Sequence, residues 1–344
     1  MPDAIQVMMH LSTAVHLLRP MEFRKGPLMQ RSNSIFYVIL LGLLYGSSLV
    51  ASRFSVGQYE PLVYISLRLI LAAIAYLAIY VVTIRIMHRR RWPTDRALWG
   101  HSALLAILGT ALPMTAIVSS LQYQSSGVTS MLITLNPAVT VLLAHFFLSD
   151  ESLTMRKFVG IVVALAGAGL LFVRGETGLA AFVQADWRGY GWVALGIFSS
   201  ASAGVYARRF LRSADSFDVS SIRILISALV LVPIVYFTVG YDLGNIDNYG
   251  YSALLYAALV GTFAGMWLGF LIIKRYGATT ASQTAYVIPV VTTILGAIIL
   301  DEHVTPVMLI GMSIILLGIA LLNSKGSKRR RSLPFKRSAP SGVA

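Results

Sequence analysis

The sequence predicts an all-α integral membrane protein with ten transmembrane helices. Three observations predict this fold: the composition, the spacing of the apolar segments, and the placement of basic residues between them. Of the 344 residues, 56% are hydrophobic and 12% are charged, and the mean hydropathy is +0.73. A water-soluble core of this size cannot enclose so much apolar surface, so much of the chain is expected to face lipid.

Ten apolar segments follow one another from Ile35 onward. At 1.5 Å per residue, each can cross about 30 Å of hydrocarbon as a helix. They are expected at residues 35–54, 62–84, 98–120, 127–148, 155–173, 189–208, 219–240, 250–273, 278–300 and 305–323. Only the short polar turn 149–154 separates the fourth from the fifth, so these two are expected to be antiparallel neighbours.

The two ends of the chain are expected to be cytoplasmic tails, residues 1–34 and the basic residues 324–344. Two alternatives for the first tail are an interfacial amphipathic segment and a true start at Met21 or Met29. It contains no clean apolar core followed by a small-residue cleavage site, as a signal peptide would.

Basic residues set the expected topology. With the N-terminus inside, 23 Lys and Arg residues fall on inside segments and three, Arg53, Arg174 and Arg188, on outside segments. Because Lys and Arg resist translocation, both termini are expected in the cytoplasm. The net charge of +14 then reflects topology, and no nucleic-acid partner is expected.

One block occurs twice, from Pro137 to Leu171 and from Pro289 to Leu322. Each copy has a proline in an apolar run, an acidic turn, and a second apolar run with spaced glycines. After the turn, Glu151, Thr154, Gly160 and Gly167 lie 151 residues before Glu302, Thr305, Gly311 and Gly318.

Other matches extend the repeat to five spans. Arg53 and Arg68 precede Arg208 and Arg223 by 155 residues. The predicted repeats are residues 35–174 and 189–323. An odd number of crossings places the second copy upside down, and many secondary transporters are built from such inverted repeats.

The repeated block resembles the proline, Glu-x-x-Thr and Gly-x(6)-Gly signature of EamA-type transporters of the drug/metabolite transporter superfamily, from about Ile35 to Leu322. An extra residue in the first copy leaves Asp150 and Glu151 as alternatives for the family glutamate, and the Thr and Gly register favours Glu151. The resemblance implies a carrier in a bacterial inner membrane that exports amino acids or related metabolites.

No motif in the sequence predicts catalysis. The six histidines form no HExxH pair, no Walker-type loop is present, and there is no cysteine. We therefore expect no enzyme activity, no metal site and no cofactor.

All fourteen acidic residues fall in predicted tails or loops. We interpret Glu151 and Glu302 as helix-end charges beside the N-caps Thr154 and Thr305, with Pro306 in the first turn. The alternative is a gate, since the matched acids lie on opposite membrane faces. Without an acid inside a span, exchange or facilitated diffusion is favoured over tight proton coupling.

Arg68 and Arg223 each lie a few residues inside an apolar run. Snorkelling towards headgroups would account for both. The alternative is that they form or gate the route of a solute that carries a carboxylate.

Polar side chains concentrate in spans one, three, four, six, eight and nine, whereas the fifth and tenth are almost wholly apolar. Because polar groups avoid lipid, spans one, three, four, six, eight and nine are expected to surround a hydrated cavity, with the fifth and tenth at its margin. The resemblance implies the same lining. The predicted substrate contacts are Asn136, Gln283, Trp267 and Tyr286, followed by Tyr45, Ser48, Ser202 and Tyr206. Helix-to-helix hydrogen bonding is the alternative for each serine and threonine.

Pro137 and Pro289 each remove a hydrogen bond near mid-span. They predict static kinks or, at equivalent points of two halves, hinges.

Together these features predict a secondary transporter of a small metabolite that works by alternating access. The alternatives from other classes are a membrane-embedded enzyme and a non-transporting scaffold subunit. Partners are expected to be the solute and the lipid bilayer. Glycines in the fifth and tenth spans would support a homodimer or pack within one subunit.

Overall fold

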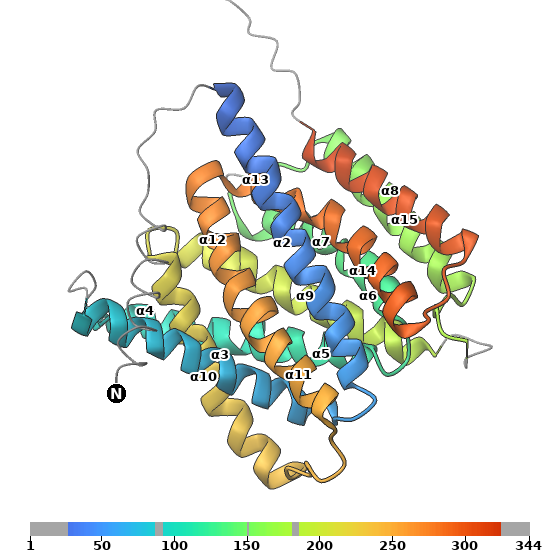
Figure 1. Cartoon of the computed structure of the whole chain (residues 1–344). Coiled ribbons are helices and arrows are strands. Elements are labelled where there is room, and N and C mark those ends of the chain that lie inside the picture. Colours follow the sequence, from blue (N-terminus) through green and yellow to red (C-terminus); the bar gives the residue numbers. More distant parts are fainter. Residues whose placement is uncertain (1–26, 87–91, 150, 181–185, 325–344) are drawn as a thin grey trace, which may run out of the picture.

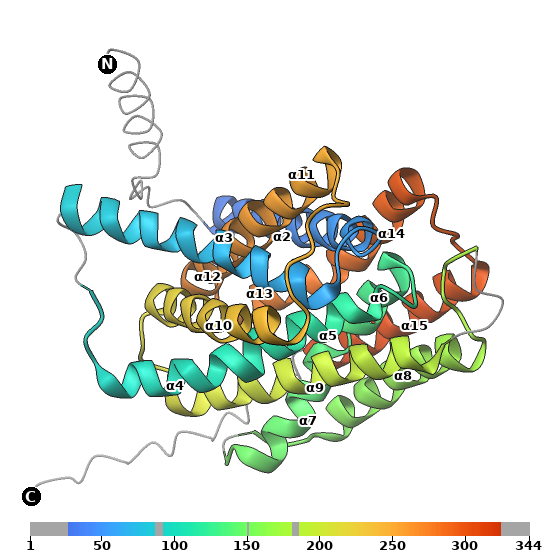
Figure 2. The same cartoon turned by 90° about the horizontal axis from the view of Figure 1, so that it is seen from below.

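The computed structural model describes residues 27–86, 92–149, 151–180 and 186–324. Within these ranges the chain is built from helices, and none of the described residues forms a strand (Figures 1 and 2). The all-α prediction is confirmed.

The first half of the chain forms five helical passages, and two of them change their winding partway. In order, they are α2 (Pro27–Ser55), α3 (Pro61–Val81) with the π-helical η1 (Val82–Ile86), α4 (Arg96–Ala106) with the π-helical η2 (Ile107–Ala111) and α5 (Leu112–Ser120), α6 (Ser126–Ile133) with α7 (Asn136–Phe147), and α8 (Met155–Val173).

The second half repeats this pattern. Its passages are α9 (Trp187–Phe210), α10 (Ser216–Thr238), α11 (Asn248–Tyr256) with the π-helical η3 (Ala257–Ala264) and α12 (Gly265–Tyr276), α13 (Ala278–Ser282) with α14 (Thr284–Leu300), and α15 (Pro306–Asn323). The third passage of each half therefore contains a π-helical segment, and the fourth passage of each half is broken.

Side-chain caps explain where several helices begin. The Glu60 carboxylate accepts hydrogen bonds from the backbone of Leu62 and Val63 at the start of α3. The predicted N-caps are confirmed: Thr154 accepts from Lys157 N, and Thr305 accepts from Met308 N at 3.1 Å. Each cap satisfies a donor that the first helical turn leaves without a partner.

Nine helical segments of the described residues are long and apolar enough to cross a membrane. Nine of the ten predicted spans are therefore supported, and the remaining one, the sixth passage α9, is not among them. It has 24 residues but carries Ser199, Ser200 and Ser202 and has two arginines, Arg208 and Arg209, in its last turn. Because α9 packs against both α5 and α7, part of its surface is shielded from lipid, and such a helix needs less apolar surface.

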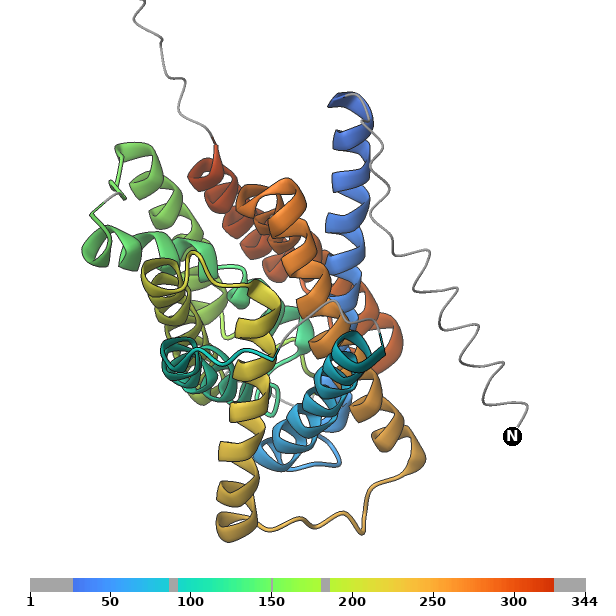
Figure 3. The same ribbon diagram turned by 90° about the vertical axis from the view of Figure 1, so that its left-hand side faces the viewer.

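Helices of the two halves pair across the molecule. The pairs α2 with α14 and α7 with α9 join the first passage of one half to the fourth passage of the other. The second passages, α3 and α10, pack together, and so do the fifth passages, α8 and α15. Exchange of the two halves leaves this pattern unchanged, as a two-fold relation between five-helix units requires. Figures 1 and 3 show α2 beside α14.

The pair α8 and α15 lies at one margin of the bundle (Figure 1). Glycines bring the two backbones into contact: a Cβ on Gly167 would lie 2.8 Å from Gly311 O, and a Cβ on Gly160 would lie 2.8 Å from Gly318 O. These glycines therefore pack within one chain, which is the second of the two alternatives that the sequence left open. The outward faces of both helices carry exposed apolar side chains, such as Phe158 and Ile310, suited to lipid.

Candidate functional site

A cavity of about 500 Å³ lies among α2, α6, α7, α12, α13, α14 and α15. Its wall includes Leu41 in the middle of α2, Ile273 near the end of α12 and Asn323 at the end of α15. The ends of α12 and α15 lie towards the top of Figure 1. We call this the open end of the bundle.

The broken fourth passages supply most of the polar wall. The first break follows Ile133, and the wall beside it carries Ser130, Thr134, Asn136 and Thr140. The second break, between α13 and α14, adds Ser282 and Thr284. A helix that breaks inside a membrane exposes backbone groups that need polar neighbours, and such breaks are tolerated where they line a cavity.

Asn136 is the predicted contact that the cavity wall positions best. Its Nδ2 donates to Ser200 Oγ on α9 at 3.0 Å, and its Oδ1 accepts from Thr140 Oγ1 at 3.1 Å. These two bonds leave the amide one donor and one acceptor position for a ligand.

Tyr45 also lies on the wall, and Tyr286 contacts it indirectly. The Tyr45 ring lies against Gly265 of α12, where a Cβ would lie 3.1 Å from ring atom Cδ1. Tyr286 Oη accepts from Nδ2 of Asn323, a wall residue, at 3.1 Å. The tenth span was expected to be almost wholly apolar, and its end instead contributes this amide.

Besides Tyr286 and Ser48, four further predicted contacts lie off the cavity wall. Trp267 and Gln283 are exposed and do not line the cavity. Ser202 and Tyr206 instead line a separate pocket of about 260 Å³ between α7, η2 and α9. There the Tyr206 hydroxyl is 2.8 Å from His101 Nδ1. The π-helical η3 lies just before α12, and its winding differs from the 3.6-residue period of an α-helix, so the face on which Trp267 lies does not follow from its span alone.

The matched arginines lie in different surroundings. Arg68 is buried, and its guanidinium donates to three hydroxyls: Nε to Thr262 Oγ1 at 2.7 Å, Nη1 to Ser52 Oγ at 2.9 Å and Nη2 to Ser48 Oγ at 3.0 Å. Ser48, a predicted substrate contact, is thus a partner of Arg68. The snorkelling interpretation of Arg68 is wrong, since its head lies between helices.

Arg223 on α10 also points into the bundle and does not reach towards headgroups. Its Nη2 lies 4.0 Å from Met266 Sδ on α12, and its buried Nε has no hydrogen-bond partner. Snorkelling therefore does not describe this residue either.

The two prolines are not equivalent in the structure. Pro137 lies in the first turn of α7, directly after the break, where its missing N–H removes no helical hydrogen bond. Pro289 lies inside α14. The sequence expectation of matched mid-span kinks is therefore wrong for Pro137, because the chain has already left the helix at Thr134 and Leu135.

At the opposite end of the bundle, which we call the closed end, Glu302 links the second half of the chain to the first. This side chain is 8% exposed. Its carboxylate accepts from Ser126 N at 2.7 Å, Ser126 Oγ at 2.8 Å and Gly127 N at 3.2 Å. Glu302 thus caps α6, a helix of the other half of the chain, and the dipole of that helix favours the negative charge.

Neighbouring loops reinforce the closed end. Ser125 N donates to Thr177 O at 2.7 Å, and His303 N donates to Gly178 O at 3.0 Å. Thr305 Oγ1 donates to Glu176 Oε2 at 2.9 Å. The loops before α6, after α8 and before α15 therefore hold one another together.

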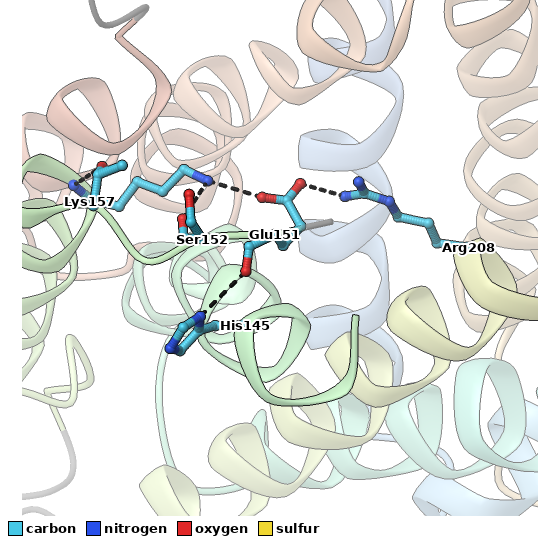
Figure 4. Close-up of polar contacts among 6 residues, drawn as sticks. His145, Glu151, Ser152, Lys157 and Arg208 are labelled. Carbon is cyan, nitrogen blue, oxygen red and sulfur yellow. Dashed lines mark hydrogen bonds and ion pairs between the residues drawn. The ribbon is translucent and has the colours of Figure 1, made fainter. Parts of the chain in front are cut away.

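The matched acid, Glu151, has different partners (Figure 4). Its carboxylate lies 2.9 Å from Lys157 Nζ and 2.6 Å from Arg208 Nη1. These hydrogen bonds from two cations hold the pKa of Glu151 below its ordinary value. Glu151 is partly exposed and caps no helix of the other half among the described residues.

Comparison with known proteins decides the family. The sequence profile described as the EamA-like transporter family matches residues 32–173 and again 187–324. The chain belongs to the EamA-like transporter family. Membership makes this chain a multi-pass membrane transporter.

Several relatives of this transporter are themselves named as transporters or exporters. It is 26% identical over 284 residues to an uncharacterized transporter of Archaeoglobus fulgidus, covering 82% of this chain and 95% of that protein. An uncharacterized transporter of Bacillus subtilis is 22% identical over 293 residues, covering 85% and 97%. A probable terminal-alkyne amino-acid exporter of Streptantibioticus cattleyicolor is 24% identical over 217 residues, covering 62% and 69%.

A solved crystal structure also resembles this transporter. The TM-score is 0.58 at 19% identity, over 84% of this chain and 96% of the other. At this identity the likeness supports the fold alone.

The transporter also uses residues that sequence reasoning did not select. Ser130, Thr140 and Asn323 lie on the cavity wall, and Ser126 binds Glu302. For Ser126 the only signal was its place after Ser125 at the start of a predicted span, which does not reveal a partner 176 residues away. For Asn323 there was none, because one amide at the end of an apolar span is typical of a helix end.

Proposed function

We propose that this transporter exports amino acids or related small metabolites by alternating access. The observation that supports the proposal is the contrast between the two ends of one bundle. A cavity with polar and apolar walls is open at one end, while loops and a buried carboxylate join the other. A carrier needs this arrangement in each of its two access states.

We further propose that both termini are cytoplasmic and that the membrane is a bacterial cytoplasmic membrane. Under this orientation the open end faces the cytoplasm, where a solute for export is loaded. The distribution of Lys and Arg supports the orientation. The name of the Streptantibioticus cattleyicolor relative supports amino acids as the class of solute.

The proposed binding surface combines Tyr45, Asn136, Thr140 and Asn323 with apolar wall residues such as Ile288. The polar groups would bind the head of the solute, and the aliphatic wall would accept its side chain. The cavity wall of the described residues contains no carboxylate, so exchange or facilitated diffusion is proposed over tight proton coupling.

The test uses counterflow in proteoliposomes that contain the purified full-length chain. Vesicles are preloaded with a mixture of unlabelled amino acids, and entry of each labelled amino acid is followed. At least one amino acid should accumulate transiently above the level in empty vesicles. Absence of counterflow for every amino acid would refute the proposed class of solute.

Two matched variants connect the flux to the cavity. Asn136→Leu removes an amide on the wall and should reduce counterflow at least about tenfold, as expected when a hydrogen bond to a charged solute group is lost. Gln283→Leu changes an exposed amide off the wall and should leave counterflow within about twofold of wild type, a change of less than about 0.5 kcal/mol. If the two variants lose counterflow equally, the solute does not bind at the cavity wall beside Asn136.

A further inference from the structure

The two matched arginines differ in how fully their guanidinium groups are satisfied. Arg68 makes hydrogen bonds to three hydroxyls through three nitrogens. Arg223 keeps a buried Nε without a partner, and its Nη2 faces the weak acceptor Met266 Sδ. A cation inside a membrane protein is costly without hydrogen-bond partners, so this difference requires an explanation.

The repeat explains the difference at the level of sequence. The offset of 155 residues that relates Arg68 to Arg223 also relates Ser48 and Ser52 to Ala203 and Ala207. The counterparts of two hydroxyls that hold Arg68 are therefore methyl groups, and one of them, Ala203, lies at Gly109 together with Arg223. The second half lacks the polar cradle that the first half provides.

The third hydroxyl that binds Arg68, on Thr262, shows the same difference between the two halves. Each arginine faces a Gly-Thr pair in a π-helical segment: Arg68 faces Gly261 and Thr262, and Arg223 faces Gly109. Thr262 accepts from Arg68, whereas the buried hydroxyl of Thr110, the residue after Gly109, has no partner. Both the guanidinium and the threonine that would serve it retain hydrogen-bonding capacity.

No acid neutralises Arg223 among the described residues. The nearest acid along α10, Asp218, accepts a hydrogen bond from Tyr80 Oη at 2.6 Å. Neither ion pair of Glu151 involves Arg223. The positive charge is therefore available to an anion from outside the protein.

The cavity lies beside this charge. Tyr45, a wall residue, packs its ring against Gly265, which is the residue before Met266. Met266, which covers Nη2, is one helical turn from the wall residue Gly269 on α12. Methionine is flexible, and movement of its side chain would join the guanidinium to the cavity.

We propose that Arg223 recognises the carboxylate of the transported solute, and that Arg68 stabilises the bundle. This inference rests on the proposed function, because it takes the cavity as the solute site. It narrows the solute to a small amphipathic molecule with a free carboxylate. The guanidinium offers two N–H donors to such a group in a geometry that the carboxylate matches.

The test uses benzoate and benzamide as probes, because they share size and ring but only benzoate carries a charge. Thermal unfolding of the purified full-length chain is followed with increasing amounts of each, at constant ionic strength. Benzoate should bind wild type at least about tenfold more tightly than benzamide, since a hydrogen bond to a charged group is lost with the amide. Arg223→Gln should abolish this preference, and Arg223→Lys should retain part of it.

Arg68→Gln is the matched control. It should lower the melting temperature without probe, because three hydroxyls lose their donor, while the preference for benzoate remains. Arg223→Gln without probe should melt at or above the wild-type temperature, because it removes an unpaired buried charge. Equal binding of the two probes by wild type, or a preference that survives in Arg223→Gln, would overturn the proposal.

Counterflow separates this proposal from the proposed function. If no amino acid is exchanged while benzoate still depends on Arg223, the amino-acid class fails and the carboxylate site stands. If amino acids are exchanged equally well by wild type and Arg223→Gln, the carboxylate site fails and the proposed function stands.

Discussion

The closed and open ends of the bundle contain the same sequence feature in two different arrangements. At the closed end, Glu302 is buried and accepts three hydrogen bonds from the start of α6. At the open end, its counterpart Glu151 is partly exposed and forms ion pairs with Lys157 and Arg208. One acid joins the two halves through a helix terminus, and the other is held by basic side chains.

The difference teaches that the acidic turn has two sets of partners. The structural interpretation of these acids as charges at their own helix ends is incomplete, since Glu302 caps a helix of the other half. The closed end is held by a few hydrogen bonds to Glu302, which a substitution can remove.

The largest effect is expected from Gly296→Ala. A Cβ at this position would collide with Glu302 Oε2 and lie 2.7 Å from Ser126 Oγ. Displacing the carboxylate loses hydrogen bonds to a charged group worth about 1.5–3 kcal/mol each. The closed end should therefore open.

The chain has no cysteine, so a single Thr293→Cys reports this opening. Thr293 is buried one turn from Gly296. Its labelling by a polar maleimide should rise at least about tenfold when Gly296→Ala is added, because one lost bond already exceeds about 1.4 kcal/mol. Gly204→Ala, where a Cβ meets open space, is the control. Unchanged labelling would show that Glu302 does not hold this end.

A smaller effect is expected from Gly318→Ala, which tests the contact between α8 and α15. This helix pair extends from the open end to the closed end. The new Cβ would lie 2.7 Å from both Ala164 Cα and Gly160 O, and backbone cannot move aside cheaply. Overpacking of this kind costs about 1–3 kcal/mol. Denaturant unfolding in detergent should show that loss.

The control for this variant is Gly169→Ala on α8, where a Cβ meets nothing within 4 Å. It should be neutral or raise stability by up to about 1 kcal/mol through helix propensity. If both alanines have the same effect, the close contact between α8 and α15 is not what stabilises the pair.

The smallest effect is expected from Glu151→Gln at the open end. Because Arg208 is 45% exposed, the ion pairs should contribute less than about 1 kcal/mol. The folded pKa of Glu151 is lowered from 4.5, so the contribution is complete above the ordinary pKa. It is lost as the pH falls through the lowered value.

The measurement is the difference in melting temperature between wild type and Glu151→Gln across a pH series. The difference should be small and constant near neutral pH and should vanish in acid below 4.5. A difference that grows in acid would contradict the role of Lys157 and Arg208.

The sequence predicted the parts of this molecule that depend on local chemistry. Apolar length predicted the helices, and Thr154 and Thr305 were predicted as caps because a threonine hydroxyl accepts from the first turn whatever surrounds it. The repeat offset predicted that Arg68 and Arg223 are matched. These features need only residues near one another in the chain.

The parts that the sequence did not predict depend on helix faces and distant loops. Trp267 and Gln283 were selected because their spans carry polar side chains, and the polarity of a span does not say which of its faces lines the cavity. The partner of Glu302 lies 176 residues away. The difference between the arginines was visible only once Ser48 and Ser52 were seen to hold Arg68.

The glycine contact between α8 and α15 constrains how the bundle can change shape. Two helices that touch through their backbones have no layer of side chains between them that would let one slide or tilt against the other, so α8 and α15 must move together. If the other passages tilt to exchange the open and closed ends, this helix pair supplies the fixed reference about which those passages turn. Its own axis would keep the same angle to the membrane throughout.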